Sequence, residues 1–221
     1  MSRRFLRTVS TLAPGLVLAP ERYDPERELE AQGSLRLGDL VTIANDGVSA
    51  ARLAELGERL VLDTSHAHEG VVLASATELE RGAPLSAKRL LAPGDLIISR
   101  LRPYLRQVAW VAAGLFLLAP AGNVVVASAE FYVLRPRAGH DLAGLVPFLL
   151  SAPVQRALAA GQEGGHHPRF ARELLLELPV PRELLDGLER HAGAVREAVE
   201  RVRAGFTELA RLSLEAGRAL G

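Results

Sequence analysis

Residues 92–107 read APGDLIISRLRPYLRQ and combine a turn, an apolar run and a basic loop. Pro93 and Gly94 suit the second and third positions of a type II turn, since proline presets φ and glycine accepts a positive φ. The turn leads into the apolar run 96–99, which is typical of a buried strand. Pro103 disfavours further ladder pairing. We therefore expect a strand that ends in an exposed basic loop.

Similar patterns on both sides of this stretch predict a mixed α and β body. Strand-like runs separated by turn residues fall at 37–43, 59–62, 70–73, 107–111, 123–127 and 131–134. Helical periodicity covers 142–150 and 153–160, with Ser151 as N-cap and Gly161 as C-terminal stop. We expect an α/β (mixed α+β) domain over 1–181, of which 1–34 is a loosely structured lead-in with a short polar helix at 26–32.

Residues 182–221 have the pattern of one long helix. Apolar residues recur at heptad spacing and predict a dimerisation seam: Leu188, Val195, Val199, Val202, Phe206 and Leu209. A continuous helix here would be about 50 Å long. Four glycines lie in or beside it, and each costs about 1 kcal/mol relative to alanine inside a helix. The seam therefore predicts a partner helix. The alternative is an ordinary terminal helix packed on its own domain.

Composition excludes several classes of protein. The 221 residues include no cysteine, which removes disulfide frameworks, thiol nucleophiles and zinc knuckles. The single lysine, Lys88, follows Ala87, so no phosphate-binding P-loop is present. The apolar stretch near the N-terminus is short and broken by Pro14 and Gly15, so we expect a cytoplasmic protein without a membrane segment. The net charge of zero argues against nucleic acid, but only as a sum over the chain.

Two histidines suggest a metal site. On a strand, His66 and His68 would point to the same face, and Asp63 or Glu69 could add a ligand. A polar turn at the end of a strand has the same appearance. A metal-dependent hydrolase using His66 and His68 therefore remains an alternative function.

The basic loop suggests contact with DNA. Six basic residues between positions 81 and 107 are opposed only by Asp95. At the end of a strand, Arg100 and Arg102 would project to one side, and a guanidinium pairs bidentately with phosphate or with guanine O6 and N7. The candidate DNA-binding residues of this region are Lys88, Arg89, Arg100, Arg102, Tyr104 and Arg106. A solvated charged edge would look the same.

A second candidate is the glycine-hinged loop 161–170, GQEGGHHPRF. Its glycines permit close approach to a sugar-phosphate backbone, and His166, His167 and Arg169 supply polar contacts. A plain surface loop would be similar. Methyltransferase and dinucleotide-binding motifs are missing from the chain.

Taken together, these segments resemble one half of the DNA-specificity subunit of type I restriction-modification systems. The resemblance covers roughly residues 20–215 and rests on the order of five motifs: 37–41 LGDLV, 93–105 PGDLIISRLRPYL, 129–136 AEFYVLRP, 148–151 FLLS and 178–181 LPVP. It implies a target-recognition domain that reads part of a bipartite site, followed by a spacer helix. That helix pairs with a second one and docks an adenine methyltransferase subunit; a restriction and translocation subunit is a further partner in such systems.

The chain departs from the family pattern in two places. Arg182-Glu183-Leu184-Leu185 replaces the usual Pro-Leu-x-x-Gln after the Pro-x-Pro, which puts the usual docking contacts in doubt. His166-His167-Pro168-Arg169 stands where Arg-Pro-Arg is frequent. The family also has two recognition domains and two helices, so the resemblance implies a half-subunit that forms a homodimer or pairs with another half.

We therefore expect a non-enzymatic protein that recognises double-stranded DNA, with no cofactor and no bound metal. Arg100, Arg102 and Arg106 would contact phosphates and base edges, Tyr104 would position them, and Lys88, Arg89 and Arg169 would mainly contact phosphates. A coiled-coil interaction protein that does not bind DNA is the other alternative.

Overall fold

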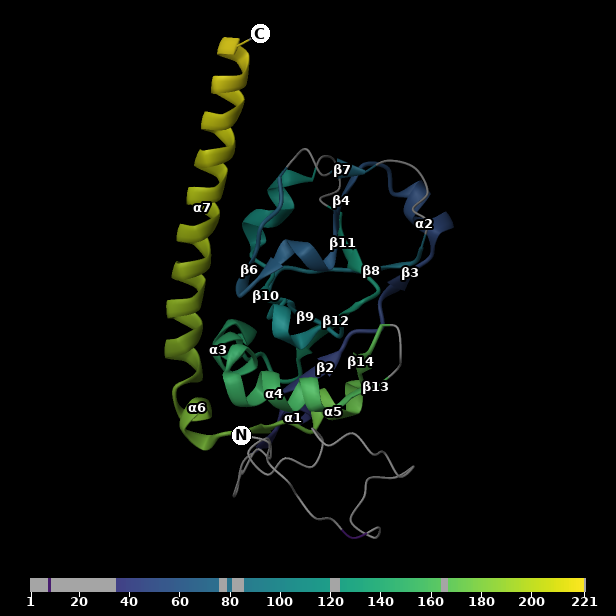
Figure 1. The fold of residues 1–221 in the computed structure, drawn as a ribbon, viewed down its shortest axis with the longest axis vertical. Helices are drawn as coiled ribbons and strands as arrows, with labels where there is room; N and C mark the ends of the chain where they lie inside the picture. Colours follow the sequence, from purple (N-terminus) through teal and green to yellow (C-terminus); the bar gives the residue numbers. More distant parts are fainter. Residues whose placement is uncertain are drawn as a thin grey trace.

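The computed structural model describes residue 8 and residues 35–75, 79–80, 86–119, 124–163 and 167–220. The expected lead-in at 1–34, with its helix at 26–32, falls outside these residues apart from Thr8, and so does His166. The described chain has mixed α and β structure and ends in a long helix (Figure 1), which confirms the expected fold class.

Two β-sheets form the body. The larger has six strands in the order β2-β12-β9-β10-β6-β5, antiparallel except between β10 and β6. Its strands are β2 (Val41–Ile43), β5 (Ala67–His68), β6 (Gly70–Val72), β9 (Leu96–Ser99), β10 (Val108–Trp110) and β12 (Phe131–Pro136). The smaller sheet has five strands in the order β3-β8-β11-β4-β7, with β11 and β4 parallel. They are β3 (Gly47–Val48), β4 (Arg59–Leu62), β7 (Leu79–Glu80), β8 (Lys88–Leu90) and β11 (Val125–Ser128).

Two short strand pairs and the helices before α7 complete the body, and the long helix α7 follows it. The strand pairs are β1 (Leu35–Arg36) with β15 (Pro179–Val180) and β13 (Gln162–Glu163) with β14 (Arg169–Phe170). The α-helices are α1 (Leu37–Leu40), α2 (Ala50–Glu55), α3 (Val146–Leu150), α4 (Ala152–Ala160), α5 (Arg172–Leu176), α6 (Arg182–Asp186) and α7 (Leu188–Leu220). The 3-10 helices are η4 (Thr64–His66), η6 (Pro103–Leu105), η7 (Ala113–Leu118) and η8 (Leu142–Leu145).

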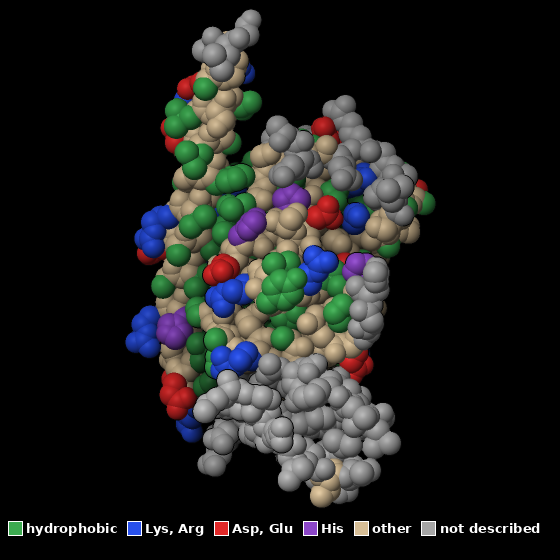
Figure 2. All heavy atoms as spheres, in the orientation of Figure 1, with side chains coloured by type: hydrophobic (Ala, Val, Ile, Leu, Met, Phe, Trp, Pro, Cys, Tyr) green, Lys and Arg blue, Asp and Glu red, His purple; other side chains and the backbone are tan. Residues whose placement is uncertain are grey.

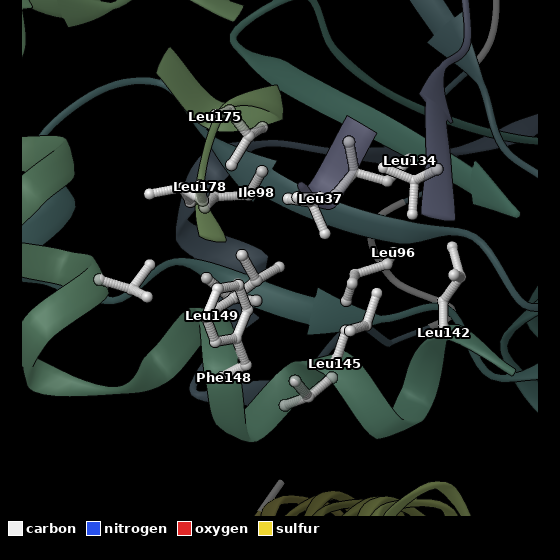
Figure 3. Packing of buried hydrophobic residues seen from close by; sticks show 14 of the residues in the cluster. Leu37, Leu96, Ile98, Leu134, Leu142, Leu145, Phe148, Leu149, Leu175 and Leu178 are labelled. Carbon is white, nitrogen blue, oxygen red and sulfur yellow. The ribbon is translucent and has the colours of Figure 1, made fainter. Parts of the chain in front are cut away.

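The central strand β9 is apolar throughout because both of its faces are buried. Leu96 and Ile98 face a core shared with the helices, where Leu145 and Leu149 of η8 and α3 pack (Figure 3). Ile97 points the other way, into a core shared with the five-stranded sheet. The expected type II turn before β9 is present, since Gly94 has a φ of +88° and the Asp95 amide bonds the Ala92 carbonyl at 3.1 Å.

One expected strand is partly wrong. Residues 37–40 form the helical turn α1, and only Val41–Ile43 is strand. Leu37 and Leu40 lie three residues apart and are both buried, which is helical spacing. The Asp39 carboxylate accepts a hydrogen bond from the Arg36 amide at 2.7 Å and caps the turn.

The long C-terminal helix begins later than expected. Residues 182–186 form the separate short helix α6, and α7 runs from Leu188 to Leu220, about 50 Å at 1.5 Å per residue. Its first turns pack on the body, where Leu188 and Ala192 are buried, and its C-terminal turns extend past the body (Figure 1). Gly144 of η8 allows this close packing, because a Cβ there would lie 2.5 Å from the Leu188 carbonyl oxygen.

Within the described ranges, no single helix has the length and apolar character needed to cross a membrane; the bent pair Leu142–Leu150 and Ala152–Ala160 meets both criteria jointly.

Candidate nucleic-acid interface

The basic loop after β9 has a strained backbone. Arg102 and Arg106 flank η6 and both have left-handed backbones, with φ of 45° and 52°. Such conformations cost of order 1–3 kcal/mol for residues other than glycine and persist only where the surroundings impose them. Because the strand ends at Ser99 and Arg102 is left-handed, Arg100 and Arg102 do not lie on one face of a strand. That expectation is wrong.

Glu130, in the turn between β11 and β12, binds two of the expected arginines. Its Oε2 accepts hydrogen bonds from Arg100 Nε at 2.9 Å and Arg169 Nε at 2.9 Å. Its Oε1 accepts a third from Arg169 Nη2 at 2.6 Å. The basic loop after β9, the β11–β12 turn and the glycine-hinged loop therefore meet at one carboxylate.

These contacts keep Glu130 ionised. The hydrogen bond from Arg169 is the main cause that lowers the pKa of Glu130 to about 2 from its ordinary 4.5, and the hydrogen bond and charge of Arg100 add to it. Partial burial acts in the opposite direction. The cluster therefore holds one negative and two positive charges over the whole physiological range.

Backbone and ring contacts fix the same cluster. Leu101 and Arg169 form a β-bridge, and the Phe170 amide donates to the Arg100 carbonyl at 3.3 Å. The Tyr132 hydroxyl donates to the Phe170 carbonyl at 3.0 Å, and the Arg100 guanidinium carbon lies 6.0 Å from the centre of the Tyr132 ring. The two segments that the sequence marks separately as DNA-contacting are thus adjacent.

The other side chains of the basic loop differ in exposure. Tyr104 is 70% exposed, and Arg102 is also exposed. Arg106 is half-buried and bound to other parts of the chain, because its Nη1 donates to the Leu150 carbonyl at 2.8 Å and its Nε lies 3.1 Å from Glu69. The Leu150 carbonyl is at the C-terminus of α3, where a cation is favourable. Arg106 therefore has a structural role in this conformation.

Lys88 and Arg89 lie on β8 of the smaller sheet and point to opposite faces. Lys88 pairs with Ser128, whose hydroxyl accepts a hydrogen bond from the Glu130 amide at 3.3 Å, so Lys88 lies beside the cluster. Arg89 has a buried Nε that makes no hydrogen bond in the described part of the chain. His167 is exposed, and its carbonyl accepts a hydrogen bond from Arg169 Nη1 at 2.9 Å.

The histidine pair does not form the expected arrangement. His66 belongs to η4 and His68 to β5, so the two are not on one strand face. The Asp63 amide donates to His66 Nδ1 at 2.9 Å. Across the residues that the structure describes, no three His, Asp or Glu side chains are placed to hold a metal ion.

The predicted seam of α7 is divided into two parts. Leu188, Val195 and Val199 pack against the body of their own chain. Val202 and Leu209 are 47% and 66% exposed, and Phe206 is half-buried. Figure 2 shows hydrophobic side chains along the part of α7 that extends past the body. Only the C-terminal half of the seam is therefore open to a partner.

The sequence matches no protein-family model and no curated protein. The fold matches a chain of a solved structure described as "Structural basis underlying complex assembly and conformational transition of the type I R-M system", with a TM-score of 0.56 and 20% identity. The match covers 87% of this chain and 48% of the other. This likeness is one of fold. The chain spans about half the length of that structural neighbour.

Glu130 is the residue that sequence analysis missed. It lies in the motif AEFYVLRP, which was noted only for its resemblance. Its partners Arg100 and Arg169 are 30 and 39 residues away, so no local pattern connects them. Leu212 of α7, which is 45% exposed, was also missed.

Proposed function

We propose that this chain recognises a specific sequence of double-stranded DNA, as the specificity component of a type I restriction-modification-like system. The observation that carries the proposal is the meeting of Arg100 and Arg169 at one partly exposed cluster beside the exposed Arg102 and Tyr104. Arginine guanidiniums and a tyrosine on one surface provide contacts to phosphates and to base edges.

The fold supports the proposal. The structural neighbour belongs to a type I R-M system, and this chain matches about half of it with one body and one long helix. We propose the boundary between recognition domain and spacer helix at 181/182. The packing of Leu188 on the body means that helix and body move together, which would fix the orientation of the recognition surface.

The open part of α7 supports pairing with a second copy. We define its distal face as Val202, Leu209 and Leu212, which share one side of the helix and are exposed. Beside the N-terminal half of α7, a groove of about 310 Å³ runs against α3 and reaches Val202 of the distal face; its other lining residues include Pro147, Leu150, Val195 and Ala198. An antiparallel pair centred near Val202 places each distal face over the partner's groove.

This pairing predicts the form of the target. Two identical recognition bodies related by a two-fold axis bind an interrupted palindrome. The partners we propose are a second copy, an adenine methyltransferase subunit and, in a restricting system, a restriction and translocation subunit. The protein itself would carry no catalytic site.

A random-duplex selection with the full-length chain, in the presence and absence of the methyltransferase partner, tests the function. We expect enrichment of one interrupted palindrome. In the variant Arg100→Ala/Arg102→Ala, each lost base contact weakens binding to that duplex by about 1–3 kcal/mol. The matched control is Arg52→Ala, which removes an exposed arginine from α2. Absence of any enrichment with folded protein contradicts the function, and unchanged binding by the double variant contradicts the site.

A further inference from the structure

Arg169 and Tyr132, which lie beside Arg100, already make hydrogen bonds within the protein. Arg169 uses Nε and Nη2 on Glu130 and Nη1 on the His167 carbonyl. The Tyr132 hydroxyl is bound to the Phe170 carbonyl. Arg169 and Tyr132 are therefore suited to hold other groups in place.

Arg100 itself is held from one side only. Glu130 binds its Nε, and the Tyr132 ring lies against the guanidinium. In the described ranges, neither Nη of Arg100 makes a hydrogen bond, and the side chain is 29% exposed. The orientation of the guanidinium is thus fixed, while its two Nη groups remain available to donate hydrogen bonds side by side to a ligand.

The negative charge of Glu130, next to the two Nη groups, favours a base edge over a phosphate as their ligand. The Glu130 carboxylate offsets part of the Arg100 charge, so it weakens the attraction of a phosphate to the Nη groups more than that of an uncharged base edge. The edge of a guanine carries no net charge, and its O6 and N7 accept both Nη donors at once. Base recognition also requires a fixed guanidinium orientation, which phosphate attraction does not.

We propose that Glu130 is a positioning residue that holds Arg100 to read one guanine through O6 and N7 in the major groove. This inference rests on the proposed DNA-recognition function and names the base that the cluster reads. Arg169 completes the arrangement by binding both oxygens of Glu130, which fixes the carboxylate itself.

The test uses the full-length chain and the duplex that it selects. We expect the wild-type protein to prefer guanine at one position of each half-site by about 5- to 150-fold, as a bidentate arginine contact provides. Replacing that guanine by 7-deazaguanine, which lacks the N7 acceptor, should remove most of the preference. In Arg100→Ala, which has no donor for N7, the 7-deaza substitution should have little further effect.

The variant Glu130→Gln should lose most of the guanine preference while binding mismatched duplexes at least as tightly as the wild type, because a negative charge is removed. Glu130→Asp keeps the charge but withdraws the carboxylate by one methylene, so it should lose the preference with an unchanged salt dependence. If Glu130→Gln fails to fold, Glu130→Asp alone tests whether the guanine preference depends on Glu130. The control Glu55→Gln removes the carboxylate of another arginine ion pair, with Arg52 on α2, and should change nothing.

The outcomes separate the two proposals. If the wild-type chain selects no sequence, the proposed function fails and this inference fails with it. If it selects a sequence but the Glu130 variants keep the guanine preference, or 7-deazaguanine binds equally well, only this inference is overturned. A uniform loss of affinity for all duplexes by folded Glu130→Gln also overturns it, since that result indicates a structural role alone.

Discussion

Acidic side chains hold the basic ones in this protein. Glu130 holds Arg100 and Arg169, Asp95 holds Arg135, and Glu69 lies against Arg106. The Asp95 side chain is the most buried of the three carboxylates, with 3% exposure. It also accepts a hydrogen bond from the Ala92 amide at 2.8 Å, which fixes the turn before β9. Arginines that look alike in the sequence therefore have different roles.

Asp95→Ala should lower the free energy of unfolding by about 3 kcal/mol, because it leaves the partly buried Arg135 without its main partner. Asp46→Ala is the matched control, since Asp46 pairs with the same arginine but its side chain is 44% exposed. Asp46→Ala should lower the free energy of unfolding by less than about 1 kcal/mol. Urea denaturation measures both, and equal losses would show that burial of Asp95 does not matter.

The lowered pKa of Glu130 predicts a pH-dependent stability. A carboxyl whose pKa is about 2 in the folded chain and 4.5 ordinarily stabilises the fold fully above pH 4.5. That stabilisation is lost as the pH falls from 4.5 toward 2. The difference in unfolding free energy between wild type and Glu130→Gln should therefore shrink over this range. A difference that stays constant down to about pH 3 would contradict the ionised cluster.

At the level of elements, strand β9 and its turn were predictable because local chemistry specifies them: Pro93 and Gly94 for the turn, and three consecutive apolar residues for a strand buried on both faces. Helix α1 was not, because four residues with only Leu37 and Leu40 as large apolar side chains fit either a strand end or a single helical turn. The contact of α5 with α1 decides between them, since a Cβ on Gly38 would lie 3.2 Å from the Leu176 Cβ.

The candidate site was predictable only in part. The pattern indicated the basic loop and the glycine-hinged loop as two separate segments. Their junction at Glu130 depends on the pairing of β9 with β12 and on the bridge between Leu101 and Arg169, which bring together residues far apart in the chain. The same limit applies to α7, where heptad spacing marks Val195 and Val202 alike. Only the position of the body shows that Val195 is half-buried within the chain while Val202 is exposed.

The docking of α7 depends on a small residue in η8. Gly144→Ala should destabilise the protein by about 1–3 kcal/mol, because the added Cβ would overlap the Leu188 backbone. Gly193→Ala within α7 meets nothing within 4 Å and should instead stabilise it by up to about 1 kcal/mol. Thermal unfolding of both variants measures the contrast. Equal midpoints for the two would mean that α7 does not pack closely on η8.

At the scale of the whole molecule, the chain is one body with a helix that is covered on its first half and open on its second. That division favours the antiparallel pair over a parallel one, because a parallel pair would leave both grooves beside α3 unfilled.

Disulfide trapping tests the orientation, and the absence of native cysteine makes each introduced one unique. Val202→Cys lies at the centre of the antiparallel pair and should cross-link to its own copy on oxidation. Leu209→Cys lies away from the centre and should not. Efficient cross-linking through position 209 would indicate a parallel pair, and a monomer in sedimentation experiments would contradict self-pairing.

The affinity of the full-length chain for its selected duplex and for a shuffled duplex, measured by fluorescence anisotropy from about 50 to about 200 mM salt, tests the central claim most directly. Sequence-specific recognition predicts that the selected duplex binds at least about 1,000-fold more tightly and that binding to both duplexes weakens steeply with salt. Equal affinity for the two duplexes, or binding that does not respond to salt, would contradict it.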